Sequence, residues 1–200
     1  MSMVLTLFAA RDETIARVLA DPPLVWLLVA PDDPDAYADA RRRTQRGGLL
    51  SRLLGRRLQT ENATLTVSPD EGELADLDKA WHGIHFLLTR SAGDGAPPLN
   101  FLLAGGEEVV GEEVGYCAPR AYRASQVTEI EAALARVSDD ELRQRFEPLA
   151  MMQASVYPEI WDRPVAEDDS LGYLMEYSAV LRTALRTLAT RSYGMFVALS

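Results

Sequence analysis

The stretch Asp78-Lys79-Ala80-Trp81-His82-Gly83-Ile84-His85-Phe86-Leu87-Leu88-Thr89 contains the only lysine of the protein and both of its histidines. It lies within a longer apolar pattern with steps of three and four residues, which predicts an amphipathic helix packed on the core. The pattern comprises Leu74, Leu77, Trp81, Ile84 and Leu88. Upstream, the order Ser-Pro-Asp-Glu at residues 68–71 is typical of a helix start. We therefore expect one buried helix from about residue 69.

One face of this expected helix carries polar groups that could do chemistry. Asp78, His82 and His85 are spaced at i, i+4 and i+7, beside the apolar stripe. A carboxylate one turn from an imidazole can fix its tautomer, which a general base and a metal ligand both need. The alternative is an ordinary amphipathic helix with polar residues at the edge of its buried stripe. On that pattern we expect Trp81 to be buried and His85 to lie at the edge of the burial.

Composition limits the class of protein. A length of 200 residues fits one domain, and a formal net charge of −10 argues against general affinity for nucleic acid. The single cysteine, Cys117, can form no intrachain disulfide and has no companions for a zinc site. No apolar run approaches the roughly 18 residues of a membrane span, and residues 1–10 do not resemble a signal peptide. We expect a soluble cytoplasmic protein with no bound metal.

The segment from about residue 31 to 63 differs from the rest of the sequence. Seven arginines follow one another there without an intervening acid: Arg41, Arg42, Arg43, Arg46, Arg52, Arg56 and Arg57. Residues 47–55 could form a short basic amphipathic helix that marks a membrane or partner surface. The other interpretation is a solvated insertion whose arginines pair with the protein's own acids. We predict a flexible basic insertion in which residues 41–57 are exposed and contribute nothing to the core.

A second charged cluster lies at residues 107–113, where glycines flank four carboxylates: Glu107, Glu108, Glu112 and Glu113. Carboxylates this close could bind a cation, orient a base or raise one another's pKa. Their spacing is not that of a calcium loop, and a solvated acidic turn is the simpler interpretation. The sequence has no phosphate-binding glycine motif, so no cofactor is predicted.

The rest of the sequence indicates an α+β fold, mostly helical with a small sheet. Residues 3–9 and 193–199 are predicted strands that pair near each other, and 114–122 is a third. Helices are predicted after Asp12, Ser125, Ser138 and Pro148, and most strongly over residues 171–188. Residues 24–29 can be strand or helix. Residues 157–161 form an expected aromatic loop in which Trp161 fills the core.

Residues 77–89, with the pattern Asp-Lys-x-Trp-x-x-x-His, resemble the YfbM-like family of small bacterial proteins (domain of unknown function 1877). Three later features fit the resemblance: Pro98-Leu99 with the following Gly-Gly-Glu-Glu, the helical region 125–146, and Tyr157-Pro158-Glu159. The resemblance covers most of the sequence outside residues 31–63. It implies a single α+β domain over residues 1–200, with no established activity and no catalytic residue to carry over. It singles out Lys79, Trp81 and His85 rather than His82.

The sequence favours two functions over a third, a membrane-surface or nucleic-acid role through Arg41 to Arg57. The first is a non-catalytic binding or interaction module for a protein partner or a small ligand. Its candidate binding residues are Lys79, Trp81, His85, Glu108, Glu113 and Tyr157. The second is a small acid–base enzyme, hydrolase-like, that uses His85 with Glu107 or Glu112 of the acidic turn.

Overall fold

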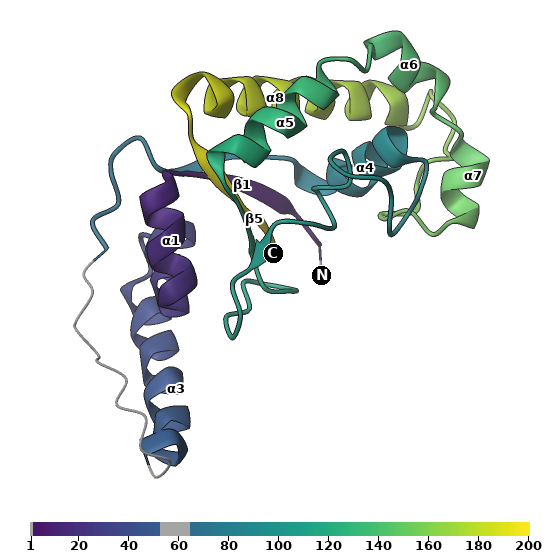
Figure 1. Cartoon of the computed structure of the whole chain (residues 1–200). Coiled ribbons are helices and arrows are strands. Elements are labelled where there is room, and N and C mark those ends of the chain that lie inside the picture. The colour runs from purple at the N-terminus through teal and green to yellow at the C-terminus, as the bar shows by residue number, and fades with distance from the viewer. Residues whose placement is uncertain (1, 53–64) are drawn as a thin grey trace.

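A five-stranded antiparallel sheet is the centre of the fold (Figure 1). The computed structural model describes residues 2–52 and 65–200, with side chains for 2–44 and 65–200. The strand order is β2-β1-β5-β4-β3. The strands are β1 (Leu5–Ala10), β2 (Gly72–Asp76), β3 (Glu107–Glu108), β4 (Arg120–Tyr122) and β5 (Gly194–Leu199). The N-terminal and C-terminal strands pair as predicted, from Leu5 opposite Leu199 to Ala10 opposite Gly194.

Helices cover both faces of this sheet, so the predicted α+β class with a small sheet is confirmed. On one face lie α1 (Asp12–Ala20), the 3-10 helix η1 (Pro22–Val25), α2 (Trp26–Val29) and α3 (Pro34–Arg52). On the other lie η2 (Asp78–Ala80), α4 (Trp81–Thr89), α5 (Ala124–Leu134), α6 (Asp139–Gln144), α7 (Pro148–Gln153) and α8 (Ser170–Arg191). Within the described ranges, no helix is long and apolar enough to cross a membrane.

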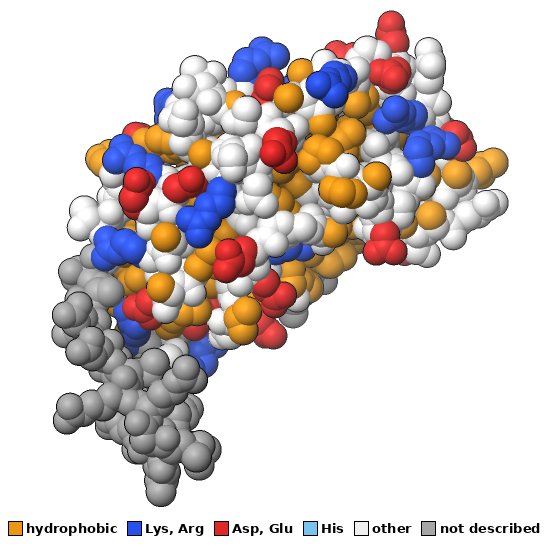
Figure 2. Space-filling view, viewed as in Figure 1, with side chains coloured by type: hydrophobic (Ala, Val, Ile, Leu, Met, Phe, Trp, Pro, Cys, Tyr) orange, Lys and Arg blue, Asp and Glu red, His pale blue; other side chains and the backbone are white. Residues whose placement is uncertain are grey.

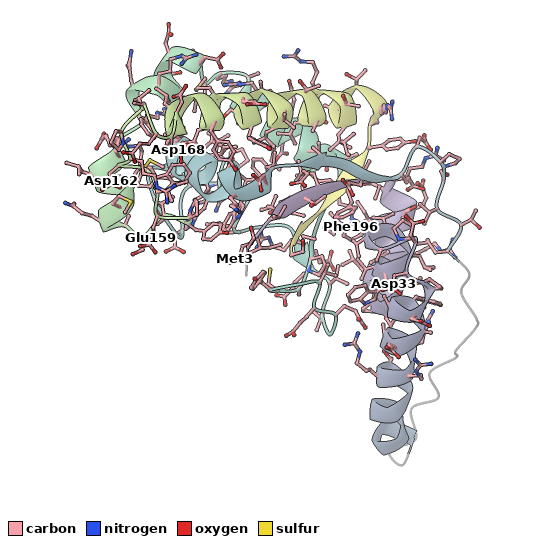
Figure 3. The ribbon with its side chains drawn as sticks, turned by 180° about the vertical axis from the view of Figure 1, so that it is seen from behind. Met3, Asp33, Glu159, Asp162, Asp168 and Phe196 are labelled. Carbon is pink, nitrogen blue, oxygen red and sulfur yellow. The ribbon has the colours of Figure 1, made fainter. Side chains whose placement is uncertain are left out.

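The alternation of side chains along the central strands creates two separate cores. Leu5, Leu7 and Ala9 of β1 pack in the larger core, with α4 to α8. Phe8 of β1 and Phe196 of β5 point to the opposite face and pack with α1, η1 and α2. Figure 3 shows Phe196 on the α1 side of the sheet. Both central strands are therefore buried on both faces, which explains their continuous apolar sequences.

The predicted helix start at residue 69 is wrong, because this part of the protein is β2 followed by η2. The Leu77 N–H donates to the Leu5 carbonyl at 2.9 Å, so the backbone extends the β1–β2 pairing instead of a helical turn. Gly72 has φ +115°, a left-handed conformation that suits glycine and interrupts any helix. The spacing of Leu74 and Leu77 imitates a helical stripe, but the helix itself begins at Trp81.

Several other predicted elements are confirmed, and two have different boundaries in the structure. Ser138 forms the capping box of α6, the long α8 is present, and Trp161 is 1% exposed, all as predicted. Residues 24–29 are helical. Ser125 is not the N-cap of α5, because Arg123 occupies that position. The predicted strand 114–122 is reduced to β4, since Gly115 turns the backbone with φ +71°.

Part of the basic segment is tied to the body of the protein. Arg41 binds Asp21 through both terminal nitrogens, at 2.6 and 2.5 Å, and donates from Nε to the Tyr37 hydroxyl. Its side chain is 23% exposed, which corrects the prediction of full exposure at this position. Arg42 and Arg43 are exposed as predicted. The side chains of residues 45–52 and all of residues 53–57 lie outside the described part of the structure, so the predicted exposure of Arg46, Arg52, Arg56 and Arg57 stays a prediction.

Candidate functional site

The first histidine of the motif joins two loops. His82 Nδ1 accepts a hydrogen bond from the Tyr157 N–H at 3.0 Å, and Nε2 lies 2.6 Å from the Ala92 carbonyl oxygen. Because Nδ1 is an acceptor, the proton must be on Nε2, which donates to Ala92. The ring also stacks on Trp81, with centroids 4.8 Å apart. Burial lowers the pKa of His82, so the imidazole is neutral when both hydrogen bonds are made.

The second histidine is more deeply buried than predicted. His85 is 0% exposed, rather than at the edge of the burial, because α4 is apolar on almost every side. Its Nε2 lies 3.0 Å from the Asp94 carbonyl oxygen, and its buried Nδ1 has no partner within the described residues. Burial lowers the pKa of His85 to about 4. The ring therefore holds the 91–96 loop on α4 as a neutral donor.

The remaining motif residues fix the backbone around these rings. Trp81 is 3% exposed, as predicted, and its Nε1–H donates to the Met3 carbonyl at 3.2 Å. The Tyr157 hydroxyl accepts from the Met3 N–H at 3.0 Å, and Figure 3 shows Met3 on the same side of the molecule as Glu159. We call Trp81, His82, His85 and Tyr157 the histidine corner. Its polar groups mostly hold backbone groups in place.

Among the described residues, no hydrogen bond or ion pair joins Asp78 to a histidine, contrary to the face predicted for it. Its carboxylate accepts from the Tyr173 hydroxyl at 2.8 Å, while the Tyr173 oxygen accepts from the Lys79 N–H at 3.1 Å. Burial and the Asp78 carboxylate raise the pKa of Tyr173. The Lys79 side chain forms no ion pair within the part of the protein that the structure describes. Asp78 and Lys79 therefore connect the start of α4 to α8.

The acidic turn contains a buried carboxylate. Glu112 follows β3, and its side chain is only 4% exposed. Its Oε2 accepts from the Trp26 indole Nε1–H at 2.8 Å and lies 3.4 Å from Nη2 of Arg43, on α3. The Arg43 side chain is 64% exposed. The buried Glu112 carboxylate thus contacts the Trp26 indole on α2 and the exposed Arg43 guanidinium on α3.

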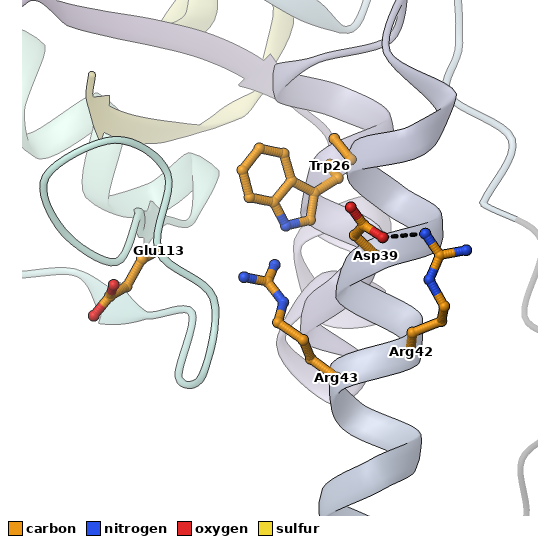
Figure 4. A pocket seen from close by; sticks show the side chains of 6 residues that line it. Trp26, Asp39, Arg42, Arg43 and Glu113 are labelled. Carbon is orange, nitrogen blue, oxygen red and sulfur yellow. Dashed lines mark hydrogen bonds and ion pairs between the residues drawn. The ribbon is translucent and has the colours of Figure 1, made fainter.

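Two hollows open beside these groups, and Arg43 and Glu113 line both. The first, of about 390 Å³, is lined by Trp26, Ala36, Asp39, Arg42, Arg43 and Glu113 (Figure 4). The second, of about 430 Å³, is lined by Arg43, Glu108, Gly111, Glu112, Glu113, Tyr116, Cys117 and Ala118. Both hollows are open to solvent and lined by several charged side chains. We call Trp26, Arg43, Glu112 and the two hollows the Glu112 site.

The sequence-predicted candidates fall into two groups. Glu108, Glu112 and Glu113 meet at the Glu112 site, whereas His85, Trp81 and Tyr157 lie in the histidine corner. Glu107 is exposed on β3 and lines neither hollow. Among the described residues, no hydrogen bond or ion pair joins His85 to Glu107 or Glu112.

Sequence reasoning did not identify Trp26 and Arg43 as site residues. Trp26 lies in an apolar run that looks like core, and Arg43 is one of seven similar arginines. The only signal was the coexistence of an acidic turn and an arginine-rich segment in one protein. Figure 2 shows acids and arginines interspersed on the face in view, without a continuous patch of either charge.

The architecture defines an α+β protein with an antiparallel sheet between two helical layers. A solved structure with this fold is "a Protein of Unknown Function YfbM from Escherichia coli". The two proteins are 16% identical, the TM-score is 0.60, and the match covers 100% of each chain. A comparison with curated proteins finds no match.

A family model matches residues 1–197, so the chain belongs to the family described as Domain of unknown function (DUF1877). This membership confirms the YfbM-like resemblance seen at residues 77–89.

Proposed function

We propose that this protein is a non-catalytic binding module, and that its ligand or protein partner binds at the Glu112 site. The observation that carries the proposal is the position of Glu112. A carboxylate that is 4% exposed contacts two side chains that line hollows open to solvent. Positioning groups in advance reduces the entropic cost of binding. We also expect the protein to act in the bacterial cytoplasm.

The histidine corner supports the acid–base alternative less well. A general base must reach the proton that it removes. His85 is 0% exposed and His82 uses both ring nitrogens for backbone contacts. Lowered pKa values fit the packing of these rings, because burial is their main cause.

A fragment screen by ¹⁵N NMR tests the proposal. We expect the fragments that bind to shift amide signals of residues 36–43 and 108–118. The matched control is a Glu112→Gln variant, in which binding should weaken while the histidine corner keeps its signals. Shifts that gather at residues 81–95, or ester hydrolysis that disappears in His85→Asn, would overturn the binding-module proposal in favour of the enzyme.

A further inference from the structure

We infer that Arg43 is the anchor for a carboxylate group of the bound partner, in the hollow beside Trp26. This inference rests on the proposed function, because it names the chemistry that the Glu112 site recognises. Arg43 is 64% exposed, yet Nη2 of its guanidinium lies 3.4 Å from Oε2 of the buried Glu112 carboxylate. An exposed arginine normally samples many rotamers, and this contact limits them.

The donors of Arg43 distinguish it from its neighbours on α3. Arg41 uses Nη1, Nη2 and Nε on Asp21 and Tyr37, so each nitrogen of its guanidinium already has a partner. Arg42 pairs with Asp39. The only hydrogen bond of Arg43 to another described residue uses Nη2 at 3.4 Å. No described residue accepts from its Nε or Nη1, so the described part of the protein leaves these donors to a ligand in the first hollow.

The surroundings of Arg43 favour a carboxylate over a phosphate. A guanidinium matches one carboxylate through two parallel hydrogen bonds. Asp39, Glu112 and Glu113 also line the two hollows, so a phosphate, with up to two negative charges, is repelled more strongly than a carboxylate.

The charge of Arg43 also disfavours a positively charged ligand group, such as an amine. In the first hollow Asp39 is paired with Arg42, so an amine there must approach the Arg43 guanidinium. The second hollow, with Glu108, Glu112 and Glu113, would instead attract an amine. Figure 4 shows the Arg43 guanidinium directed toward Trp26, while the Glu113 carboxylate points away from it. The group that fits Arg43 in the first hollow is therefore a carboxylate, from an acidic residue or from the C-terminus of a peptide.

The indole N–H of Trp26 provides a direct reporter, because it bonds the same Glu112 oxygen as Arg43. The protein has three tryptophans, and a Trp26→Phe variant assigns this ¹⁵N signal. We would titrate four probes: N-acetylglutamate amide, N-acetyl-Ala-Ala with a free C-terminus, inorganic phosphate and N-acetyllysine amide. The first two probes separate the carboxylate of an acidic residue from one at a peptide terminus.

We expect a saturable shift of the Trp26 signal with at least one carboxylate probe, with a Kd of about 1–10 mM. Arg43→Gln should weaken binding about tenfold, since the charge-assisted bonds are lost. The matched control Arg186→Gln changes an exposed arginine of α8 that lines neither hollow, and it should bind like the wild type. Unchanged signals of Trp81 and Trp161 will show that each variant is folded.

Three results would overturn the inference. They are no shift with either carboxylate, equal binding in Arg43→Gln and wild type, or a stronger response to phosphate or to the lysine probe. Fragments that still bind residues 36–43 and 108–118 in that case would leave the proposed function intact and remove only its carboxylate specificity.

Discussion

The histidine corner and the Glu112 site each bury one titratable group, but the two groups have different partners. His85 is 0% exposed and contacts a backbone carbonyl of a loop packed over it. Glu112 is 4% exposed and contacts the side chains of Trp26 and Arg43, which reach the surface. Burial alone therefore does not indicate a ligand site. The partners decide whether a buried charge or ring serves folding or positions groups for a ligand.

If this comparison is correct, changes in the histidine corner should mainly alter stability. Trp81→Ala should lower the free energy of unfolding by about 3–5 kcal/mol, because a buried indole leaves a large cavity. Urea unfolding measures the change. Trp26→Phe, at the Glu112 site, is the matched control and should lower it much less. A loss below about 1 kcal/mol for Trp81→Ala would contradict the assignment of Trp81 to the core.

The pH dependence of stability tests the neutral state of His85. Its pKa is lowered from 6.5 to about 4 in the folded protein, so the unfolded state binds the proton first as pH falls. The contribution of His85 to the free energy of unfolding should be fully present above pH 6.5. It should be lost between pH 6.5 and about 4, by about 3 kcal/mol in total.

Urea midpoints at several pH values, for wild type and His85→Asn, would measure this effect. Carboxylates such as Asp70 and Glu71 titrate in both proteins and cancel in the comparison. The variant should give a flatter curve in this window. Parallel curves would show that His85 does not contribute to the acid sensitivity.

Changes at the Glu112 site should have smaller effects on stability. Glu112→Gln keeps an acceptor for the Trp26 indole and removes the charge that holds Arg43. We expect a loss of about 1–2 kcal/mol in unfolding free energy. Thermal unfolding gives the comparison with His85→Asn. A loss as large as that of Trp81→Ala would mean that Glu112 is mainly a core residue.

The smallest losses in unfolding free energy are expected for the arginines of α3, and they should differ between Arg41 and Arg42. Arg41→Ala removes a half-buried pair with two hydrogen bonds to Asp21 and should cost about 1–2 kcal/mol. Arg42→Ala removes an exposed pair with Asp39 and should cost no more than about 0.5 kcal/mol. Equal losses in chemical denaturation would show that the contact with Asp21 has no special role.

The sequence predicted those elements whose signals are local. The capping box at Ser138, the long apolar stripe of α8 and the β-rich terminal segments were all interpreted correctly. The stretch 69–77 was not, because three-residue spacing of leucines fits both a helix and a strand that continues into a 3-10 turn. The strand state depends on pairing with β1, far away in the sequence, and no local pattern encodes that partner.

The Glu112 site was only half predicted for the same reason. Its acids are adjacent in sequence, so the sequence indicates them as candidate residues. Trp26 and Arg43 join them only through the packing of α2 and α3. The histidine corner was prominent because of rare residue types. These rare residue types lie at positions that stabilise the fold, and their rarity does not indicate that a ligand can reach them.

The central position of β5 has a consequence for how the protein is made. β1 pairs with β5 from Leu5 opposite Leu199, and β4 reaches the sheet only through β5. A ribosome therefore releases β1 long before the strand that joins both halves of the sheet is synthesised. Pairings over such sequence distances slow folding and leave strand edges open meanwhile. We expect the sheet to close only after residue 199 has emerged, which makes the nascent polypeptide dependent on protection from aggregation until then.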